Sequence, residues 1–438
     1  MSGSENILIQ RLAENKKGSP LGVYSVCSAH KTVLQASMLQ ALDDNSILII
    51  ESTSNQVDQY GGYTGMRPKD FIAYVKAIAA PLDFPIEKII FGGDHLGPNA
   101  WQAEKSAEAM DKAETLVKAY VEAGCRKIHL DASMYCADDS GSRSEPLPDK
   151  IVAERVVRLC KAAETSWNSN REGAKPLYII GTEVPVPGGS KEKESSLKPT
   201  SKEGVEETIR VTQKAFLDSG LAEAWDRVIA VVAQGGVEFG DDTVFYYNSK
   251  NAQDLKSALD ASPLVFEAHS TDYQSASCLQ NMVQDHFCIL KVGPALTFAY
   301  REALFSLAAI ERELVPAARQ SKLEDTLEEV MLSSKPNYWG KYYHGTEEEK
   351  RLARKYSFSD RSRYYWTNER LALSVQKLLA NLAAVSIPIS LISQFMPDLF
   401  MQISEGSIRA KPEDLIIAHT RKTLAVYAQA CGFTGKIK

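Results

Sequence analysis

Short runs of consecutive apolar residues, many of them β-branched, recur between residue 22 and residue 292. The runs cover residues 22–27, 47–52, 88–94, 127–131, 177–183, 228–234, 264–269 and 287–292. They are continuous rather than alternating, which is typical of strands that are covered on both faces. The pattern therefore predicts eight buried strands of a parallel sheet.

Helical spacing of apolar residues fills the stretches between these runs. It predicts helices over residues 105–123, 149–164 and 205–219. Strands that alternate with helices favour parallel pairing, because each parallel crossover needs a connection of about this length. No G-x-G-x-x-G motif follows the first run, which counts against the doubly wound dinucleotide-binding fold. We therefore expect an α/β fold, a (β/α)₈ TIM barrel.

The pattern changes after residue 313. No further strand is predicted, and residues 314–438 read as helical or irregular segments, with aromatic clusters at 338–345 and 361–366. We expect a barrel over residues 1–313 and a helical C-terminal extension, packed on the barrel, over residues 314–438. The aromatic clusters can be interpreted in two ways: as part of the hydrophobic core of the extension, or as an interface with another chain.

Composition narrows the class of protein. The chain of 438 residues carries 50 Lys and Arg against 56 Asp and Glu, a net charge of −6, whereas a nucleic-acid binder needs a basic surface. No apolar run approaches the ~18 residues of a membrane-spanning helix, and the first residues lack the pattern of an export signal. Seven cysteines without a C-x-x-C pair favour free thiols in a reducing compartment. We expect a cytoplasmic protein that binds neither nucleic acid nor membrane.

Polar side chains stand at the ends of nearly all the predicted strands. These residues are Glu51, Asp94, His95, Asp131, Glu183, Gln234, His269 and Lys291. The carboxyl ends of barrel strands meet at one rim, where barrel enzymes build their active sites. A single acid at a strand end is more often a cap of the next helix, but the convergence of so many polar groups predicts one shared site.

Two of these residues, His95 and His269, are imidazoles. With Glu183 they form a candidate three-ligand set for a divalent metal acting as a Lewis acid, Zn²⁺ or Mn²⁺, with Mg²⁺ less favoured. The sequence contains no H-x-H or H-E-x-x-H motif, so buried, hydrogen-bonded histidines remain the alternative. His129 shares a strand face with Asp131 and is a candidate supporting residue.

Glycine-containing turns are candidates for binding an anion. Gly61 and Gly62, next to Tyr63, can bring backbone N–H groups close to a ligand. Barrel enzymes often bind phosphate after strands 7 and 8, which here predicts sites at Ser270, Thr271 and Gly293. Glu51, Gln234 and Lys291 complete the expected substrate-binding set. The alternative is that the glycines only shape turns.

Several long segments resemble a known family. They are SVCSAH (25–30), ESTSNQVDQYGGYTGM (51–66), GGDHLGPN (92–99), HLDAS (129–133), GTEVPVPGG (181–189), EAHSTDYQ (267–274), KVGPALTFAYREALF (291–305) and DRSRYYW (360–366). Together they are similar to the large accessory subunit family of class II D-tagatose-1,6-bisphosphate aldolase. The resemblance implies a class II aldolase-like TIM barrel in galactitol and N-acetylgalactosamine catabolism.

The resemblance also implies two functions, because some family members are non-catalytic partners of a separate aldolase subunit and others are D-tagatose-6-phosphate 4-epimerases. In a 2-ketose C4 is not α to the carbonyl, so inversion requires cleavage of the C3–C4 bond and its re-formation. We expect an epimerase that interconverts D-tagatose 6-phosphate and D-fructose 6-phosphate by this retro-aldol route. The alternative is a non-catalytic, stabilising subunit of the aldolase.

The Asp94-His95 pair resembles the Asp-His pair of catalytic class II aldolases, in which the histidine binds zinc and the aspartate handles protons. Of the further metal-binding histidines in those enzymes, only His269 has a counterpart here. The hypothesis gives His95, His269 and Glu183 the metal, and Asp94, Asp131 and Glu183 the catalytic roles. Its partners are a ketohexose phosphate, a catalytic aldolase subunit and further copies of the chain. No nucleotide cofactor or kinase activity is expected, because the sequence has no Walker A motif.

Overall fold

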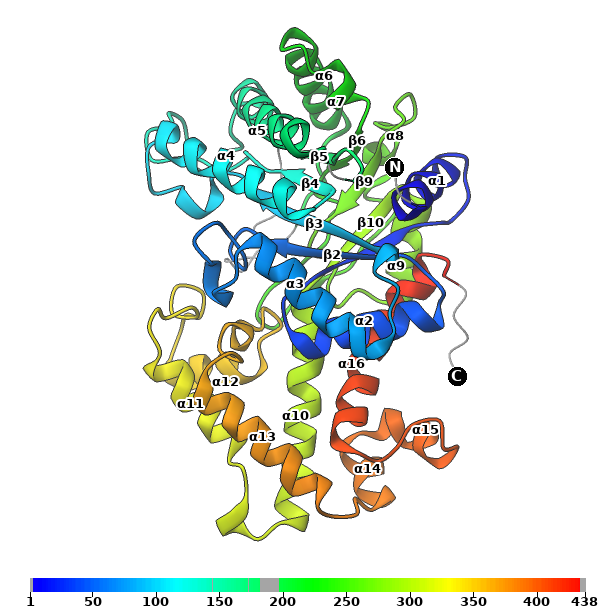
Figure 1. Ribbon diagram of the computed structural model, residues 1–438, viewed down its shortest axis with the longest axis vertical. Helices are drawn as coiled ribbons and strands as arrows, with labels where there is room; N and C mark the ends of the chain where they lie inside the picture. The colour runs from blue at the N-terminus through cyan, green and yellow to red at the C-terminus, as the bar shows by residue number, and fades with distance from the viewer. Residues whose placement is uncertain (1–2, 144, 172, 182–196, 434–438) are drawn as a thin grey trace.

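Eight parallel strands close into a barrel in the computed structural model, which describes residues 3–143, 145–171, 173–181 and 197–433 (Figure 1). The strands are β1 (Val23–Cys27), β2 (Leu48–Thr53), β3 (Ile89–Leu96), β4 (Lys127–Leu130), β5 (Leu177–Gly181), β6 (Val228–Val232), β9 (Val265–Ala268) and β10 (Phe287–Val292). Sequence order is kept around the barrel, and β10 pairs with β1 to close it. The predicted (β/α)₈ barrel is therefore confirmed.

The barrel interior is a packed core and not a pore. Its buried apolar cluster contains the first residues of three strands, Val23, Leu177 and Val265, together with Leu8 and Leu12 from helix α1 (Gly3–Lys16). Helix α1 thus closes the end of the barrel at which the strands begin. In barrels of this kind the ligand-binding site lies at the opposite end, where the strands finish.

Helices cover the outside of the barrel, as the periodicity predicts. They are α2 (Lys31–Asp43), α3 (Pro68–Ala79), α4 (Ser106–Ala123), α5 (Asp149–Asn170), α6 (Lys202–Asp218), α7 (Ala222–Trp225), α8 (Gln253–Ser257) and α9 (Ala276–Gln284). A small antiparallel hairpin, β7 (Glu238–Phe239) with β8 (Val244–Phe245), follows β6 and was not predicted. Among the described residues, no helix combines the length and apolarity needed to cross a membrane.

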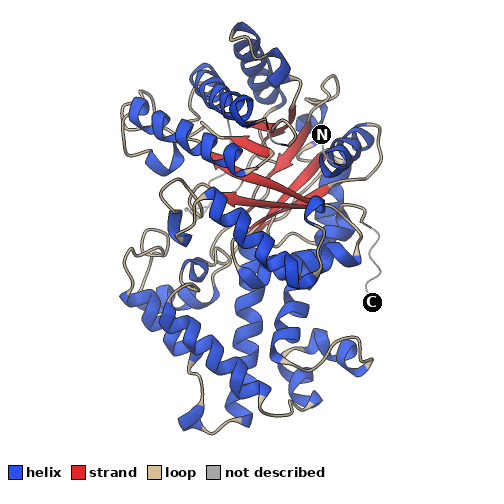
Figure 2. Ribbon diagram, in the orientation of Figure 1, coloured by secondary structure: helices blue, strands red, loops and turns tan. Residues whose placement is uncertain are grey.

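The C-terminal part is helical and is joined to the barrel through one long helix, α10 (Pro294–Leu314). It continues with α11 (Leu323–Ser333), α12 (Glu347–Tyr356), α13 (Glu369–Ala383), α14 (Ile389–Phe395), α15 (Phe400–Ser404) and α16 (Pro412–Ala430). Figure 1 shows α10 running from the barrel into the extension, with α16 alongside it. In Figure 2 the barrel strands gather in one half of the molecule, and the other half consists of helices and loops.

Helices α10 and α16 each belong to two hydrophobic cores. Leu296 of α10 and Tyr427 of α16 pack in the main barrel core, whereas Leu304 of α10 and Leu415 of α16 pack in the core of the extension. The extension is therefore anchored through helices that it shares with the barrel.

A short segment of the extension returns to the mouth of the barrel. Its 3₁₀ turn, Arg361–Tyr364, follows Asp360, which has a left-handed backbone with φ of 42°. The Thr297 hydroxyl at the start of α10 donates a hydrogen bond to Asp360, and the Tyr273 hydroxyl donates to the carbonyl of Phe358 at 2.6 Å. These bonds tie the segment to the loops that follow the barrel strands.

Candidate functional site

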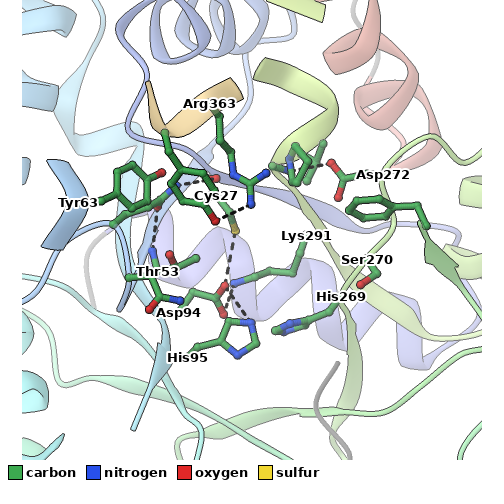
Figure 3. Close-up of a pocket in the computed structure, with 17 residues that line it drawn as sticks. Cys27, Thr53, Tyr63, Asp94, His95, His269, Ser270, Asp272, Lys291 and Arg363 are labelled. Carbon is green, nitrogen blue, oxygen red and sulfur yellow. Dashed lines mark hydrogen bonds and ion pairs between the residues drawn. The ribbon is translucent and has the colours of Figure 1, made fainter. Parts of the chain in front are cut away.

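A cavity of about 640 Å³, including its open mouth, lies at the carboxyl ends of the strands (Figure 3). The cavity is lined by strand-end residues and by the returning segment of the extension: Asp94, His95, His269, Lys291, Tyr63, Ser270, Asp272, Arg363 and Tyr364. Two chain regions far apart in sequence thus form one site.

The end of β3 is irregular, and this places two neighbouring polar residues in the cavity. Side chains normally alternate between the two faces of a strand. The register against β4 shifts between Gly93 and Leu96, and His95 adopts a left-handed backbone with φ of 50°. This bulge lets Asp94 and His95 both line the cavity. Backbone strain at a non-glycine residue of this kind is concentrated at functional sites.

His95 is held by a buried carboxylate behind it. Its Nδ1 lies 2.7 Å from Oδ2 of Asp131, while Oδ1 of the same carboxylate accepts hydrogen bonds from the Ser133 hydroxyl and amide at 2.6 and 3.1 Å. Burial alone would lower the pKa of His95, but Asp94 and Asp131 raise this pKa to about 9. The same hydrogen bond from His95 lowers the pKa of Asp131, although burial opposes this. Asp131 therefore orients His95, and the pair favours a charged imidazolium.

Four buried residues could hold a metal ion. They are Asp94, His129, Glu267 and His269, whose ligand atoms all lie within 4.8 Å of one another. Nε2 of His129 is buried and has no hydrogen-bond partner in the described part of the chain. Burial lowers the pKa of His269, which favours the neutral imidazole that a metal requires. Two imidazoles and two carboxylates suit a borderline divalent ion.

Two buried lysines neutralise the carboxylates beneath the cavity. Lys127 forms ion pairs with Glu51 and Glu267, and Lys291 forms ion pairs with Glu51 and, at 2.9 Å, with Asp94. Burial lowers the pKa of Lys291 to about 8. Burial alone would raise the pKa of Glu267, but Lys127 and His269 lower this pKa to about 2. The floor of the cavity is therefore a buried network of paired charges.

The amino end of α10, predicted to bind phosphate, is already occupied by a carboxylate of the chain itself. Oδ1 of Asp272 accepts hydrogen bonds from the amides of Gly293 and Ala295 at 3.0 and 2.8 Å. Burial raises the pKa of Asp272 to about 6. Ser270 lines the cavity, but Thr271 is fully buried and donates its hydroxyl to the carbonyl of Lys291.

The glycine turn after β2 serves mainly to present Tyr63. The amide of Gly61 donates to the Asp58 carbonyl at 3.1 Å, and the amide of Gly62 donates to the Asp58 carboxylate at 3.0 Å. A Cβ at Gly62 would lie 2.4 Å from the carbonyl oxygen of Gln56, so only glycine fits. Tyr63, which follows directly, lines the cavity.

Glu51 and Gln234, two residues predicted to bind substrate, lie outside the cavity lining. The side-chain oxygen of Gln234 accepts hydrogen bonds from the amides of Gly236 and Val237, and so shapes a turn. Glu183 lies outside the described residues. Of the predicted metal set, the structure thus brings His95 and His269 together, with ring centroids 4.8 Å apart. Sequence reasoning missed Lys127, Glu267, Asp272, Arg363 and Tyr364.

Comparison with known proteins gives a consistent family assignment. The family described as D-tagatose-1,6-bisphosphate aldolase subunit GatZ/KbaZ-like matches residues 8–432. The chain is 48% identical to D-tagatose-1,6-bisphosphate aldolase subunit GatZ of Salmonella paratyphi B over 420 residues, 96% of this chain and 98% of that protein. The GatZ of Salmonella typhimurium matches with the same identity and coverage.

One solved structure is also similar over its whole length. A crystal structure from Sinorhizobium meliloti 1021, described as a probable tagatose 6 phosphate kinase, has 44% identity and a TM-score of 0.85, covering 94% of this chain and 100% of that chain. The present sequence contains no Walker A motif, the phosphate-binding loop of P-loop kinases.

The expectation of a C4-epimerase is wrong. The curated relatives at 48% identity are named as aldolase subunits, which supports the alternative interpretation. The error has a chemical origin, because cleavage of the C3–C4 bond is common to epimerisation and to the aldolase reaction. The residue types that suit epimerisation also suit the aldolase reaction. The side chains alone therefore could not distinguish an epimerase from an aldolase subunit.

Proposed function

Because the chain belongs to the D-tagatose-1,6-bisphosphate aldolase subunit GatZ/KbaZ-like family, we propose that it is a subunit of such an aldolase, which binds a separate catalytic aldolase chain and stabilises it. The observation that carries this proposal is the match to the GatZ subunits over 98% of their length.

Stabilisation of this kind follows from mass action. A partner that binds only the folded form stabilises it by about 2.7 kcal/mol when present at 100 times its dissociation constant. The catalytic chain is therefore expected to lose activity more slowly when this chain is present in excess.

The test uses the catalytic class II aldolase chain of the same organism, purified alone and after co-expression with this chain. We expect a complex in size-exclusion chromatography, and a half-life of D-tagatose-1,6-bisphosphate cleavage at least several times longer than that of the catalytic chain alone. An equal mass of serum albumin is the control for non-specific protection. Absence of a complex, an unchanged half-life, or full cleavage activity of this chain by itself would each overturn the proposal.

We also propose that Asp94, His129, Glu267 and His269 bind Zn²⁺ or Mn²⁺. Their donor atoms and the unpartnered Nε2 of His129 support this, and two nitrogen donors disfavour Mg²⁺. Such an ion would supply Lewis-acid polarisation of a ketose oxygen. The Lys291 ammonium, 2.9 Å from Asp94, competes with the ion for this carboxylate. Tyr63, Ser270 and Lys291 would contact the sugar.

Metal analysis of the dialysed protein tests this site. We expect one equivalent of Zn²⁺ or Mn²⁺ per chain, and an affinity at least about tenfold lower in His129→Ala, since even the residues that support metal ligands contribute about this factor. His344→Ala is the control, because His344 is an exposed histidine. Equal metal content in the wild type and in His129→Ala would contradict the assignment.

A further inference from the structure

A groove on the outer surface lies between helix α12 of the extension and the tip of the β7–β8 hairpin. It has a volume of about 950 Å³, including its open mouth, and is larger than the cavity at the strand ends. Its lining includes Asp241 and Asp242 from the hairpin, and Glu349, Leu352, Ala353 and Tyr356 from α12. None of these residues lines the cavity at the strand ends, so the groove is a separate feature of the surface.

Helix α12 turns its apolar side chains toward solvent. Leu352 and Tyr356 lie one helical turn apart and are 47% and 48% exposed, whereas Arg354, on the opposite side of the helix, is buried. The Arg354 guanidinium donates to the carboxylate of Glu328 at 3.0 Å and lies over the ring of Trp339. A surface helix normally buries its apolar side and exposes its charged side. The reversed arrangement of α12 therefore favours burial of its apolar side against another chain.

The groove is acidic. Its lining contains the carboxylates of Asp241, Asp242 and Glu349, and among the described lining residues there is no lysine or arginine and only one imidazole. One carboxylate oxygen of Asp241 accepts hydrogen bonds from the hydroxyls of Ser357 and Ser359 at 2.7 and 2.9 Å. Both donors are neutral, so they do not compensate its charge. Carboxylates beside exposed apolar side chains are complementary to a segment that carries Lys or Arg next to apolar residues.

Both walls of the groove continue to the mouth of the barrel. On the hairpin, Phe239 lines the cavity at the strand ends and Asp241 lines the groove. On the opposite wall, Ser357 lines the groove and Arg363 lines the cavity. The amide of Phe358 donates to the carbonyl of Asp241 at 2.9 Å and so joins the two walls. A chain bound in the groove would therefore lie beside the mouth of the barrel.

We propose that this groove binds a basic, amphipathic segment of the catalytic aldolase chain, which places an apolar side chain against Leu352 and Tyr356 and a Lys or Arg next to Asp242. The exposed apolar side of α12 favours a protein segment over a small cation, because a small cation would not cover it. The chemistry of the segment follows from the lining of the groove. The identity of the partner rests on the proposed function.

The test measures the affinity between the full chain and the purified catalytic class II aldolase chain of the same organism. Leu352→Ser and Asp242→Lys alter opposite walls of the groove at exposed side chains. We expect each variant to weaken the complex at least about tenfold, as for residues that contribute strongly to an interface. Asp242→Lys should also reduce the loss of affinity that the wild type shows at raised salt, because it removes an attraction that salt screens.

Matched controls make the same substitutions outside the groove. They are Leu373→Ser on α13, where Leu373 is 58% exposed, and Asp254→Lys at an exposed residue of α8, and both are expected to bind as the wild type does. Equal weakening by these controls, or wild-type affinity in both groove variants, would overturn the groove assignment and leave the proposed function intact. Absence of any complex with the wild-type chain would overturn the proposed function as well. A dimer of this chain that Leu352→Ser dissociates would make the occupant a second copy and overturn the choice of partner.

Discussion

Replacing Gly97 with alanine is expected to destabilise the fold by more than about 3 kcal/mol, at the upper end of the cost of overpacking. A Cβ at this position would lie 1.5 Å from the carbonyl oxygen of Asp131 and 2.7 Å from its carbonyl carbon. Both are backbone atoms, so no rotamer change relieves the clash. Gly97 itself is extended, with φ of −178°, and the demand for glycine is therefore purely steric.

Urea unfolding followed by circular dichroism measures this effect. Gly3→Ala is the matched control, because a Cβ at Gly3 meets nothing within 4 Å, and its free energy of unfolding is expected to stay within about 0.5 kcal/mol of the wild type. A loss below about 1 kcal/mol in Gly97→Ala would show that the ends of β3 and β4 do not approach as closely as described.

Lys127→Met is expected to cost about 3–5 kcal/mol, the loss typical of removing one partner from a buried ion pair. Lys127 is completely buried and contacts the carboxylates of Glu51 and Glu267. Without it, Glu267 retains His269 at 3.1 Å and the more distant ammonium of Lys291 at 3.7 Å. Methionine fills a similar volume, so the loss reports the uncompensated charge rather than a cavity.

A double variant separates charge from packing. Lys127→Met combined with Glu267→Gln removes one charge of each sign, and is expected to recover about 1–3 kcal/mol relative to the sum of the single variants. Lys69→Met, at an exposed lysine, should change the free energy of unfolding by less than about 0.5 kcal/mol. Strict additivity of the two buried substitutions would contradict the proposed network.

Hydrophobic patterning was sufficient to predict the barrel. Each apolar run became a strand with boundaries within two residues of the prediction, as for 287–292, which is β10. A parallel strand covered on both faces must be apolar along its whole length, so its signal is local and strong. The hairpin β7–β8 was missed because strands of two residues carry no such pattern.

The site was predicted only in part. The prediction considered the last residue of each strand and did not consider the charged residues two positions earlier, inside the barrel. Lys127 and His129 are two residues apart on β4, and Glu267 and His269 are similarly spaced at the end of β9, so each pair shares one strand face. This spacing is a signal that sequence reasoning could have used. Arg363 had no comparable signal, since its place in the cavity depends on how the extension docks.

The double membership of α10 and α16 makes the whole chain one cooperative unit. A cut after residue 313 would remove α16, and with it Leu424 and Tyr427 from the barrel core, while the far half of α10 would expose Leu304 and Leu307 to water. Neither fragment keeps a complete apolar interior. Heat or denaturant should therefore unfold the barrel and the extension in a single transition. A chimera that exchanges the extension between two relatives must exchange α10 and α16 together with it.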